Sequence, residues 1–179
     1  MKRPIASIAG TGRGLPEAVM TNFDFAKIGI ETTDEWITER TGIKQRHIAR
    51  NGESTTSMAA SAARKAMHRA GVSAGEIDAI VLSTATPDRL LPATAVDLQA
   101  ELGATRAAAF DIGAACAGFI FAVTVAEGMI ATGTAETVLV VGSWTYAGTG
   151  WRTTADAALA LAAADAARLR RPAAADPAA

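Results

Sequence analysis

The 179-residue sequence is half hydrophobic and one-fifth charged, with 17 basic and 18 acidic residues and a net charge of −1. This composition can fill a core and excludes a global field that would attract nucleic acid or an anionic membrane. The single cysteine excludes an internal disulfide framework and a cysteine-based zinc site. With no apolar run of 18 residues and no signal-peptide pattern after Met1, we expect a cytoplasmic protein that does not enter a membrane.

Strand-like and helix-like segments alternate along the chain. The apolar run 5–9 predicts a strand that ends in a glycine-rich turn at 10–16, and Leu15-Pro16 there argues against a dinucleotide-binding loop. The other expected elements are an extended segment at 43–48, helices at 55–70, 94–102 and 115–131, and strands at 77–84, 106–112 and 136–142. This alternation predicts a layered α/β domain with a largely parallel sheet.

A short helix is expected between Thr32 and Gly42. Thr32 with Glu35 fits a capping box, and Gly42 fits a helix stop. Trp36 and Arg40 would share one face of this helix, because residues four apart are neighbours on a helix surface. An indole beside a guanidinium can hold a flat aromatic ligand that carries phosphate; the alternative is a tryptophan half-buried under an arginine stem.

The only cysteine, Cys116, lies between an expected strand and an expected helix, in a run of small residues. A thiol at a helix N-terminus is favoured as thiolate, the nucleophilic form. The alternative is a small buried hydrophobic residue. Upstream, Leu90 and Leu91 stand in a loop between Pro87 and Pro92, where two leucines suggest a pocket or an interface.

The composition changes after Ser143. Residues 144–179 form a divergent tail dominated by Ala, Asp and Arg, distinct from the expected domain at 1–143. The alanine content of 154–169 favours a helix with little apolar surface, and the last residues are expected to be disordered. We also entertain a shifted reading frame in a GC-rich gene, which the DNA after codon 143 tests.

Several motifs, in order, resemble the N-terminal half of beta-ketoacyl-[acyl carrier protein] synthase III, a condensing enzyme of the thiolase superfamily. The matching segments are Gly10-Thr11-Gly12 with Leu15-Pro16, 33–37, 40–43, 46–49, 111–119 and 140–143. The resemblance covers roughly residues 4–143. It implies the N-terminal half of a thiolase-like fold, with a mixed, largely parallel sheet, and the absence of the C-terminal half.

The resemblance also implies roles for particular residues. Cys116 would accept the acyl group of an acyl-CoA, which is a substrate, and no cofactor or metal is implied. Trp36, Arg40 and Thr32 would contact CoA, and Leu91 would occupy the loop that reaches the acyl pocket of the partner in family dimers. The acyl group would then condense with malonyl-acyl carrier protein, with loss of carbon dioxide, to begin fatty-acid synthesis.

No segment of the sequence matches the family's catalytic His and Asn or its second glycine-rich segment. We therefore expect that the chain alone is inactive in condensation, and that half of a two-lobed fold exposes an apolar face and associates. Two alternatives stay open: a starter-unit synthase of polyketide assembly, and a truncated or decayed chain without catalysis.

Overall fold

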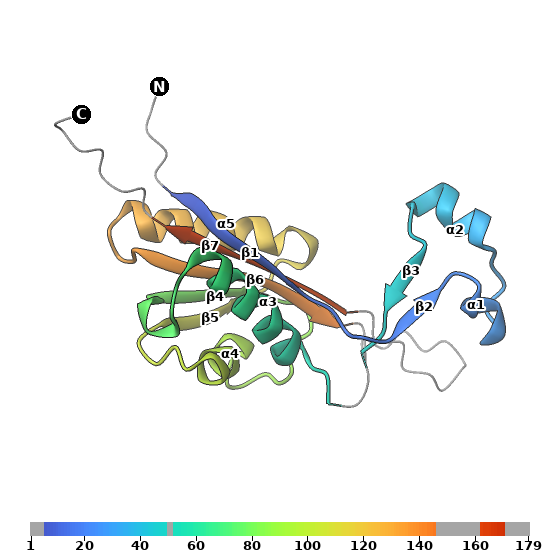
Figure 1. Ribbon diagram of the computed structural model, residues 1–179, viewed down its shortest axis with the longest axis horizontal. Coiled ribbons are helices and arrows are strands. Elements are labelled where there is room, and N and C mark those ends of the chain that lie inside the picture. The colour runs from blue at the N-terminus through green and yellow to red at the C-terminus, as the bar shows by residue number, and fades with distance from the viewer. Residues whose placement is uncertain (1–5, 50–51, 146–161, 171–179) are drawn as a thin grey trace, which may run out of the picture.

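The computed structural model describes residues 6–49, 52–145 and 162–170. Its elements, in chain order, are β1 Ser7–Gly14, β2 Val19–Thr21, α1 Asp24–Lys27, α2 Asp34–Thr41, β3 Gln45–His47, α3 Thr55–Ala70, the 3₁₀ turn η1 Ala74–Glu76, β4 Ala79–Ser83, α4 Thr94–Leu102, β5 Ala108–Ile112, the 3₁₀ turn η2 Ala115–Ala117, α5 Gly118–Ala131, β6 Thr137–Thr145 and β7 Ala162–Arg170. The predicted layered α/β arrangement is confirmed. Helices α3 and α4 lie on one side of the sheet and α5 on the other (Figure 1).

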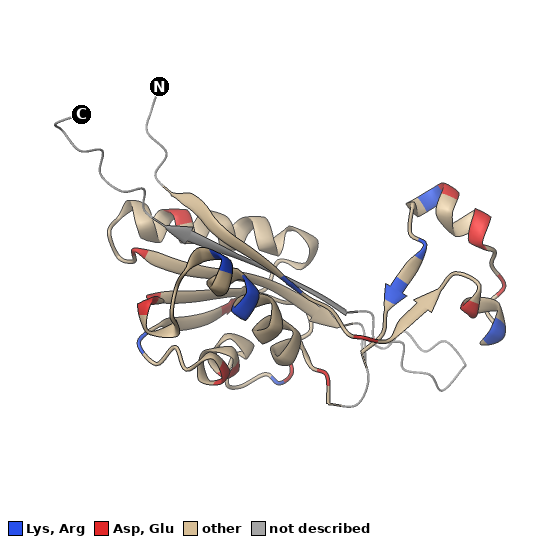
Figure 2. Ribbon diagram, in the orientation of Figure 1, with Lys and Arg blue, Asp and Glu red and all other residues tan. Residues whose placement is uncertain are grey.

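The described strands form a five-stranded sheet in the order β1-β7-β6-β4-β5, in which β7 runs opposite to the other four. Side chains of β4 and β6 alternate between two cores because successive strand residues point to opposite faces. Ile80 and Leu82 pack with α3 and α4, whereas Ala79 and Val81 pack against α5. Neither β4 nor β6 carries a charged residue (Figure 2), as expected for strands covered on both faces.

The glycine-rich segment after residue 9 is part of β1 and not the predicted turn. Gly10, Gly12 and Gly14 all lie on the face of β1 that meets α3, where an added Cβ would stand 2.0–2.4 Å from carbonyl oxygens of the helix. Two residues of a strand advance about 6.7 Å and four residues of a helix about 6 Å, so alternate glycines meet successive helix turns. The glycines therefore allow close packing of β1 on α3 and do not end the strand.

The alanine-rich tail contributes a strand, so the helix expected at 154–169 is wrong over 162–169, while its first part, 154–161, lies outside the described residues. Strand β7 pairs with β6 from Thr137↔Arg170 to Thr145↔Ala162, and with β1 from Ser7↔Arg170 to Gly14↔Ala164. Alanine favours helices in isolation, but here the segment forms backbone hydrogen bonds with a strand on each side. That pairing outweighs the helical preference. The disorder expected for the last residues concerns 171–179, which lie outside the described residues.

Between β1 and α3 the chain forms a separate segment, residues 19–47, which we call the excursion and which the sequence only partly predicted. Strands β2 and β3 pair antiparallel, and this hairpin carries α1 and α2 away from the main sheet (Figure 1). Strand β2 and α1 were not anticipated. Helix α2 begins after Thr33, whose side chain accepts from Trp36 N at 3.1 Å, so Thr33 and not Thr32 is the N-cap. Gly42 ends α2 with a φ of 69°, as predicted.

Helix α5 has an apolar outer surface. Ile120, Phe121 and Val125 are 63%, 53% and 38% exposed, and Glu127 is the helix's one charged residue. In the part of the chain that the structure describes, no helix combines the length and apolarity required to cross a bilayer.

The close packing of β1 on α3 predicts that Gly12→Ala destabilises the fold. The new Cβ would lie 2.0 Å from Ala62 O, a backbone atom that moves only with the helix. We therefore expect the free energy of unfolding, measured by urea denaturation, to fall by about 1–3 kcal/mol or more. The matched control is Gly128→Ala in α5, where the added methyl group meets nothing within 4 Å. It should raise stability by about 0.5–1 kcal/mol. Equal stability of Gly12→Ala and wild type would refute this packing role.

Candidate active site

Cys116 lies where β5 gives way to α5. The strand ends at Ile112, η2 contains the cysteine, and α5 begins at Gly118, so the helix starts three residues later than predicted. The Cys116 side chain is exposed, which contradicts the alternative of a packed hydrophobic residue. Ala115 has a φ of 44°, a left-handed conformation that no other non-glycine residue in the described part adopts. This unfavourable backbone geometry turns the chain sharply just before the thiol.

The first turn of α5 rests on the ends of two buried strands. An added Cβ on Gly118 would lie 1.9 Å from Ser83 Oγ of β4, and one on Gly142 of β6 would lie 3.2 Å from the Phe119 ring. Ser83 is opposite Ile112 in the parallel β4–β5 pair. Cys116 thus stands at the carboxyl ends of parallel strands, where open α/β sheets hold their ligands.

The loop that carries Leu91 is fixed at both ends by carboxylates. Asp88 accepts from Thr55 N at 2.8 Å and from Thr56 N at 2.9 Å, at the start of α3. Burial alone would raise the pKa of Asp88, but the hydrogen bonds from Thr56 and Thr55 outweigh it and keep that pKa below its ordinary value. Asp111 accepts from Thr94 N at 2.8 Å at the start of α4.

Between these anchors, Leu90 and Leu91 are 90% and 85% exposed. The loop therefore presents apolar side chains to the outside, which fits an interface or a pocket in another chain. The acyl-pocket role expected for Leu91 stays a prediction.

The residues expected to contact CoA gather on the excursion. The guanidinium of Arg40 lies over the Trp36 ring at 4.4 Å, and Trp36 is 53% exposed. Trp36 and Thr32 line a pocket of about 650 Å³ whose other walls are Phe25, Ile30, Glu31, Thr33, Ile37 and Arg46. The hydroxyl of Thr32 is buried and has no hydrogen-bond partner among the described residues, so its hydrogen-bonding capacity is unused in this structure.

Arg46 is a member of this pocket that sequence reasoning missed. Its guanidinium lies 4.8 Å from the Phe25 ring centre, and burial lowers its pKa below the ordinary value for arginine. Ten residues separate Arg46 from Trp36, on a strand and a helix, so no helical spacing connects them. Its neighbour His47 is within 2.7 Å of Pro16 O through Nδ1, a structural contact that agrees with assigning it no chemistry.

Neither Cys116 nor Leu91 lies among the walls of the pocket that Trp36 and Thr32 line. The sequence-predicted residues thus fall into three places: the thiol at the strand ends, the leucine loop, and the pocket on the excursion. The described residues do not bring the three into direct contact.

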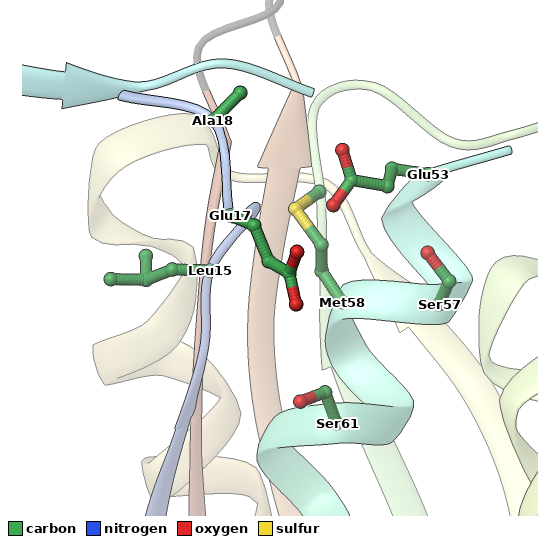
Figure 3. Close-up of a pocket in the computed structure, with 7 residues that line it drawn as sticks. All are labelled: Leu15, Glu17, Ala18, Glu53, Ser57, Met58 and Ser61. Atoms are coloured by element: carbon green, nitrogen blue, oxygen red, sulfur yellow. The ribbon is translucent and has the colours of Figure 1, made fainter. Parts of the chain in front are cut away.

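A second hollow of about 620 Å³ lies between the β1–β2 connection and the first half of α3 (Figure 3). Glu17 and Glu53 both line this hollow, together with Met58, Ser57 and Ser61 of α3. Two carboxylates oppose an anionic ligand, so this hollow does not suit a phosphate-bearing coenzyme. Arg46 makes the pocket on the excursion the more suitable of the two.

A family model and full-length relatives all match this chain to the same protein family. A family model described as 3-oxoacyl-[acyl-carrier-protein (ACP)] synthase III matches residues 110–175, a range that includes Cys116 and β7. Beta-ketoacyl-[acyl-carrier-protein] synthase III of Rhodospirillum centenum is 55% identical over 139 residues, which are 78% of this chain and 43% of the relative. The same-named protein of Xylella fastidiosa strain Temecula1 is 52% identical over 142 residues, 79% and 44% of the two chains. The chain thus spans less than half the length of these relatives.

Solved structures agree with the sequence comparison. The 3-oxoacyl-[acyl-carrier-protein] synthase III from Aquifex aeolicus superimposes with a TM-score of 0.83 at 42% identity, over 94% of this chain and 55% of that one. The priming beta-ketosynthase of the R1128 polyketide pathway gives a TM-score of 0.84 at 34% identity, over 96% and 51%. The thiolase-like fold expected for an N-terminal half is therefore confirmed.

The contact between Gly118 and Ser83 predicts a rescue experiment. Gly118→Ala should displace the start of α5 and lower the rate of Cys116 alkylation by iodoacetamide at least about tenfold, because Ser83 Oγ occupies the space of the new methyl group. Adding Ser83→Gly removes both nearby Ser83 atoms and should restore most of the rate. If Gly118→Ala reacts at the wild-type rate, or the double variant is no faster than the single one, the contact does not position the thiol.

Proposed function

Since this chain belongs to the beta-ketoacyl-[acyl-carrier-protein] synthase III family, of which it spans about the first half, we propose that it accepts an acyl group from acyl-CoA on Cys116. The observation that carries the proposal is the exposed thiol at the start of α5, at the ends of β4 and β5. An exposed sulfur in such a position can be reached by substrate.

The proposed step is a thioester exchange. The Cys116 sulfur attacks the thioester carbonyl carbon, the new carbon–sulfur bond forms, and the bond to the CoA sulfur breaks. CoA leaves as a thiolate and takes up a proton, so no oxidant or cofactor is needed. The acyl group remains on the enzyme as a new thioester of similar energy.

CoA would be bound through its nucleotide on the excursion. The exposed ring of Trp36 offers a stacking surface for adenine, and Arg40 offers a cation near phosphate. Rotation of the Thr32 side chain would turn its unpaired hydroxyl toward the ligand for a hydrogen bond. We call these three residues the coenzyme clamp. Leu91 would contribute to an acyl pocket across a dimer of the intact enzyme.

The complete family reaction is decarboxylative condensation of the acyl-enzyme with malonyl-acyl carrier protein at the start of fatty-acid synthesis in the cytoplasm. The resemblance assigns its His and Asn to a segment that nothing in this sequence matches. Loss of such groups lowers rates by orders of magnitude. We therefore propose that this chain alone carries out at most the acyl transfer, and that condensation requires a second half.

One observation favours a second candidate function. The priming beta-ketosynthase of a polyketide pathway matches the fold as well as the Aquifex enzyme does, at 34% identity. A starter-unit synthase would use the same Cys116 chemistry with a different acyl group. A non-catalytic fragment that only binds acyl-CoA is the third candidate, and the absence of acylation would favour it.

Acyl transfer predicts a covalent adduct. Incubation of the purified chain with acetyl-CoA should add one acetyl group to the peptide that contains Cys116, detected by mass spectrometry, and Cys116→Ser should abolish the fast-forming adduct. Malonyl-acyl carrier protein should yield no condensation product. An equal adduct in Cys116→Ser would exclude Cys116 as the nucleophile, and product formation by the chain alone would contradict the need for a second half.

The outer surface of α5 predicts self-association of the chain in isolation. Exposed apolar side chains on one helix favour contact with another apolar surface. Light scattering should therefore show concentration-dependent association, which Ile120→Ser with Phe121→Ser should reduce. Val19→Ser, which alters an exposed side chain on the excursion, is the control and should leave association unchanged. A wild-type chain that stays monomeric would contradict this expectation.

A further inference from the structure

Helix α2 carries Trp36 and Arg40 but is weakly anchored by apolar contacts. Of its eight residues, only Ile37 is buried. Apolar burial normally fixes a surface helix to the rest of a protein, so α2 needs another anchor to hold the coenzyme clamp in place. That anchor is polar and comes from outside the helix.

The anchor is Asn22, which is 1% exposed and follows directly after β2. Its side-chain Nδ2 donates to Asp34 Oδ1 in the first turn of α2 at 2.8 Å, with a longer contact of 3.4 Å to Thr38 Oγ1 one turn later. The same nitrogen donates to Ile43 O at 2.7 Å, just beyond the end of the helix. One amide group therefore ties down both ends of α2.

The other side of the amide holds the opposite wall of the pocket. Asn22 Oδ1 accepts a hydrogen bond from Arg46 Nη1 on β3. Arg46 also stacks on Phe25, and both side chains line the pocket with Trp36 and Thr32. The position of the guanidinium relative to the indole thus depends on the same buried side chain.

We propose that Asn22 is the positioning residue of the coenzyme clamp, fixing α2 and Arg46 relative to each other so that the nucleotide of CoA can bind between them. This inference rests on the proposed function. Asn22 itself does not line the pocket and acts through the residues that it holds.

Position 22 must donate hydrogen bonds to α2 and to the segment after it and accept one from Arg46. Only a short side chain that carries both a donor and an acceptor can do this. Asp34 and the Ile43 carbonyl accept, whereas Arg46 donates, so the orientation of the amide is fixed by its partners. A carboxylate at position 22 would keep the Arg46 contact, but would place oxygen against oxygen at Asp34 and at Ile43. An apolar residue at position 22 would remove the hydrogen bonds to Asp34, Ile43 and Arg46 altogether.

The test compares Asn22→Asp, Asp34→Asn and the double variant. In the double variant the amide and the carboxylate exchange places, which restores the donor–acceptor pair between positions 22 and 34 and keeps an acceptor for Arg46. Affinity for CoA is measured by calorimetry, and acylation of Cys116 is measured with acetyl-CoA and with acetyl-pantetheine. The second thioester lacks the nucleotide and does not use the clamp.

We expect Asn22→Asp to weaken CoA binding at least about tenfold and to slow acylation by subsaturating acetyl-CoA to the same extent. Acylation by acetyl-pantetheine should stay within about twofold of wild type, and the double variant should recover at least about threefold in CoA affinity. Lys27→Ala, which removes an exposed ion pair with Asp24 on α1, should leave all values unchanged.

Three results would overturn the proposal: CoA affinity of Asn22→Asp within twofold of wild type, an equal loss with both thioesters, or no recovery in the double variant. The second would show a general structural defect in place of a positioning role. If the wild-type chain binds CoA but neither thioester acylates it, the proposed acyl transfer fails, while the CoA affinities still decide the role of Asn22. If the wild-type chain does not bind CoA, the clamp itself is refuted.

Discussion

The close approach of Gly118 to Ser83 sets the geometry of the candidate active site. A helix can begin this near the end of a strand only where one residue lacks a side chain, and here the space beside the Gly118 Cα is filled by a serine hydroxyl. Because β4 is fully buried and flanked by β5 and β6, this contact places the start of α5 against a buried inner strand of the sheet. The packing of α5 on the centre of the sheet therefore fixes the position of the Cys116 thiol.

The coenzyme clamp is held in a different way. It stands on an excursion outside the main sheet, where α2 has little apolar contact and a buried amide replaces the core as the anchor. Polar networks of this kind fix geometry as long as every member has a partner. The candidate nucleophile and the residues proposed to bind the coenzyme are therefore positioned by physically independent means, one by packing against the sheet and the other by hydrogen bonds.

Much of this arrangement could be predicted from the sequence. The regular Ala and Met spacing before Gly71 marked α3, and the nearly continuous apolar runs marked β4 and β6, because local patterns record which faces are buried. The ordered motifs around Cys116 also identified the family correctly. These are features whose signal lies within a few neighbouring residues.

Other features depend on partners that are distant in sequence. The glycines of β1 suggested a turn because their packing partner, α3, is distant in sequence. The alanines of β7 suggested a helix because their strand partners, β1 and β6, are not neighbours in sequence either. Asn22 joins residues 12 to 24 positions away, on a helix, a loop and a strand. No local pattern indicates such a network, because its members share a location only after folding.

The place of β7 has a further consequence for how the chain reaches this structure. In the described sheet, β7 is the strand that connects β1 to the rest, so Ser7 finds its strand partner at Arg170, near the other end of the chain. During synthesis, β1 cannot pair with β7 until the chain through Arg170 has emerged. Pairings between distant segments slow folding. The same register places the two ends of the described chain side by side, an arrangement in which a circularly permuted chain could keep every strand pairing.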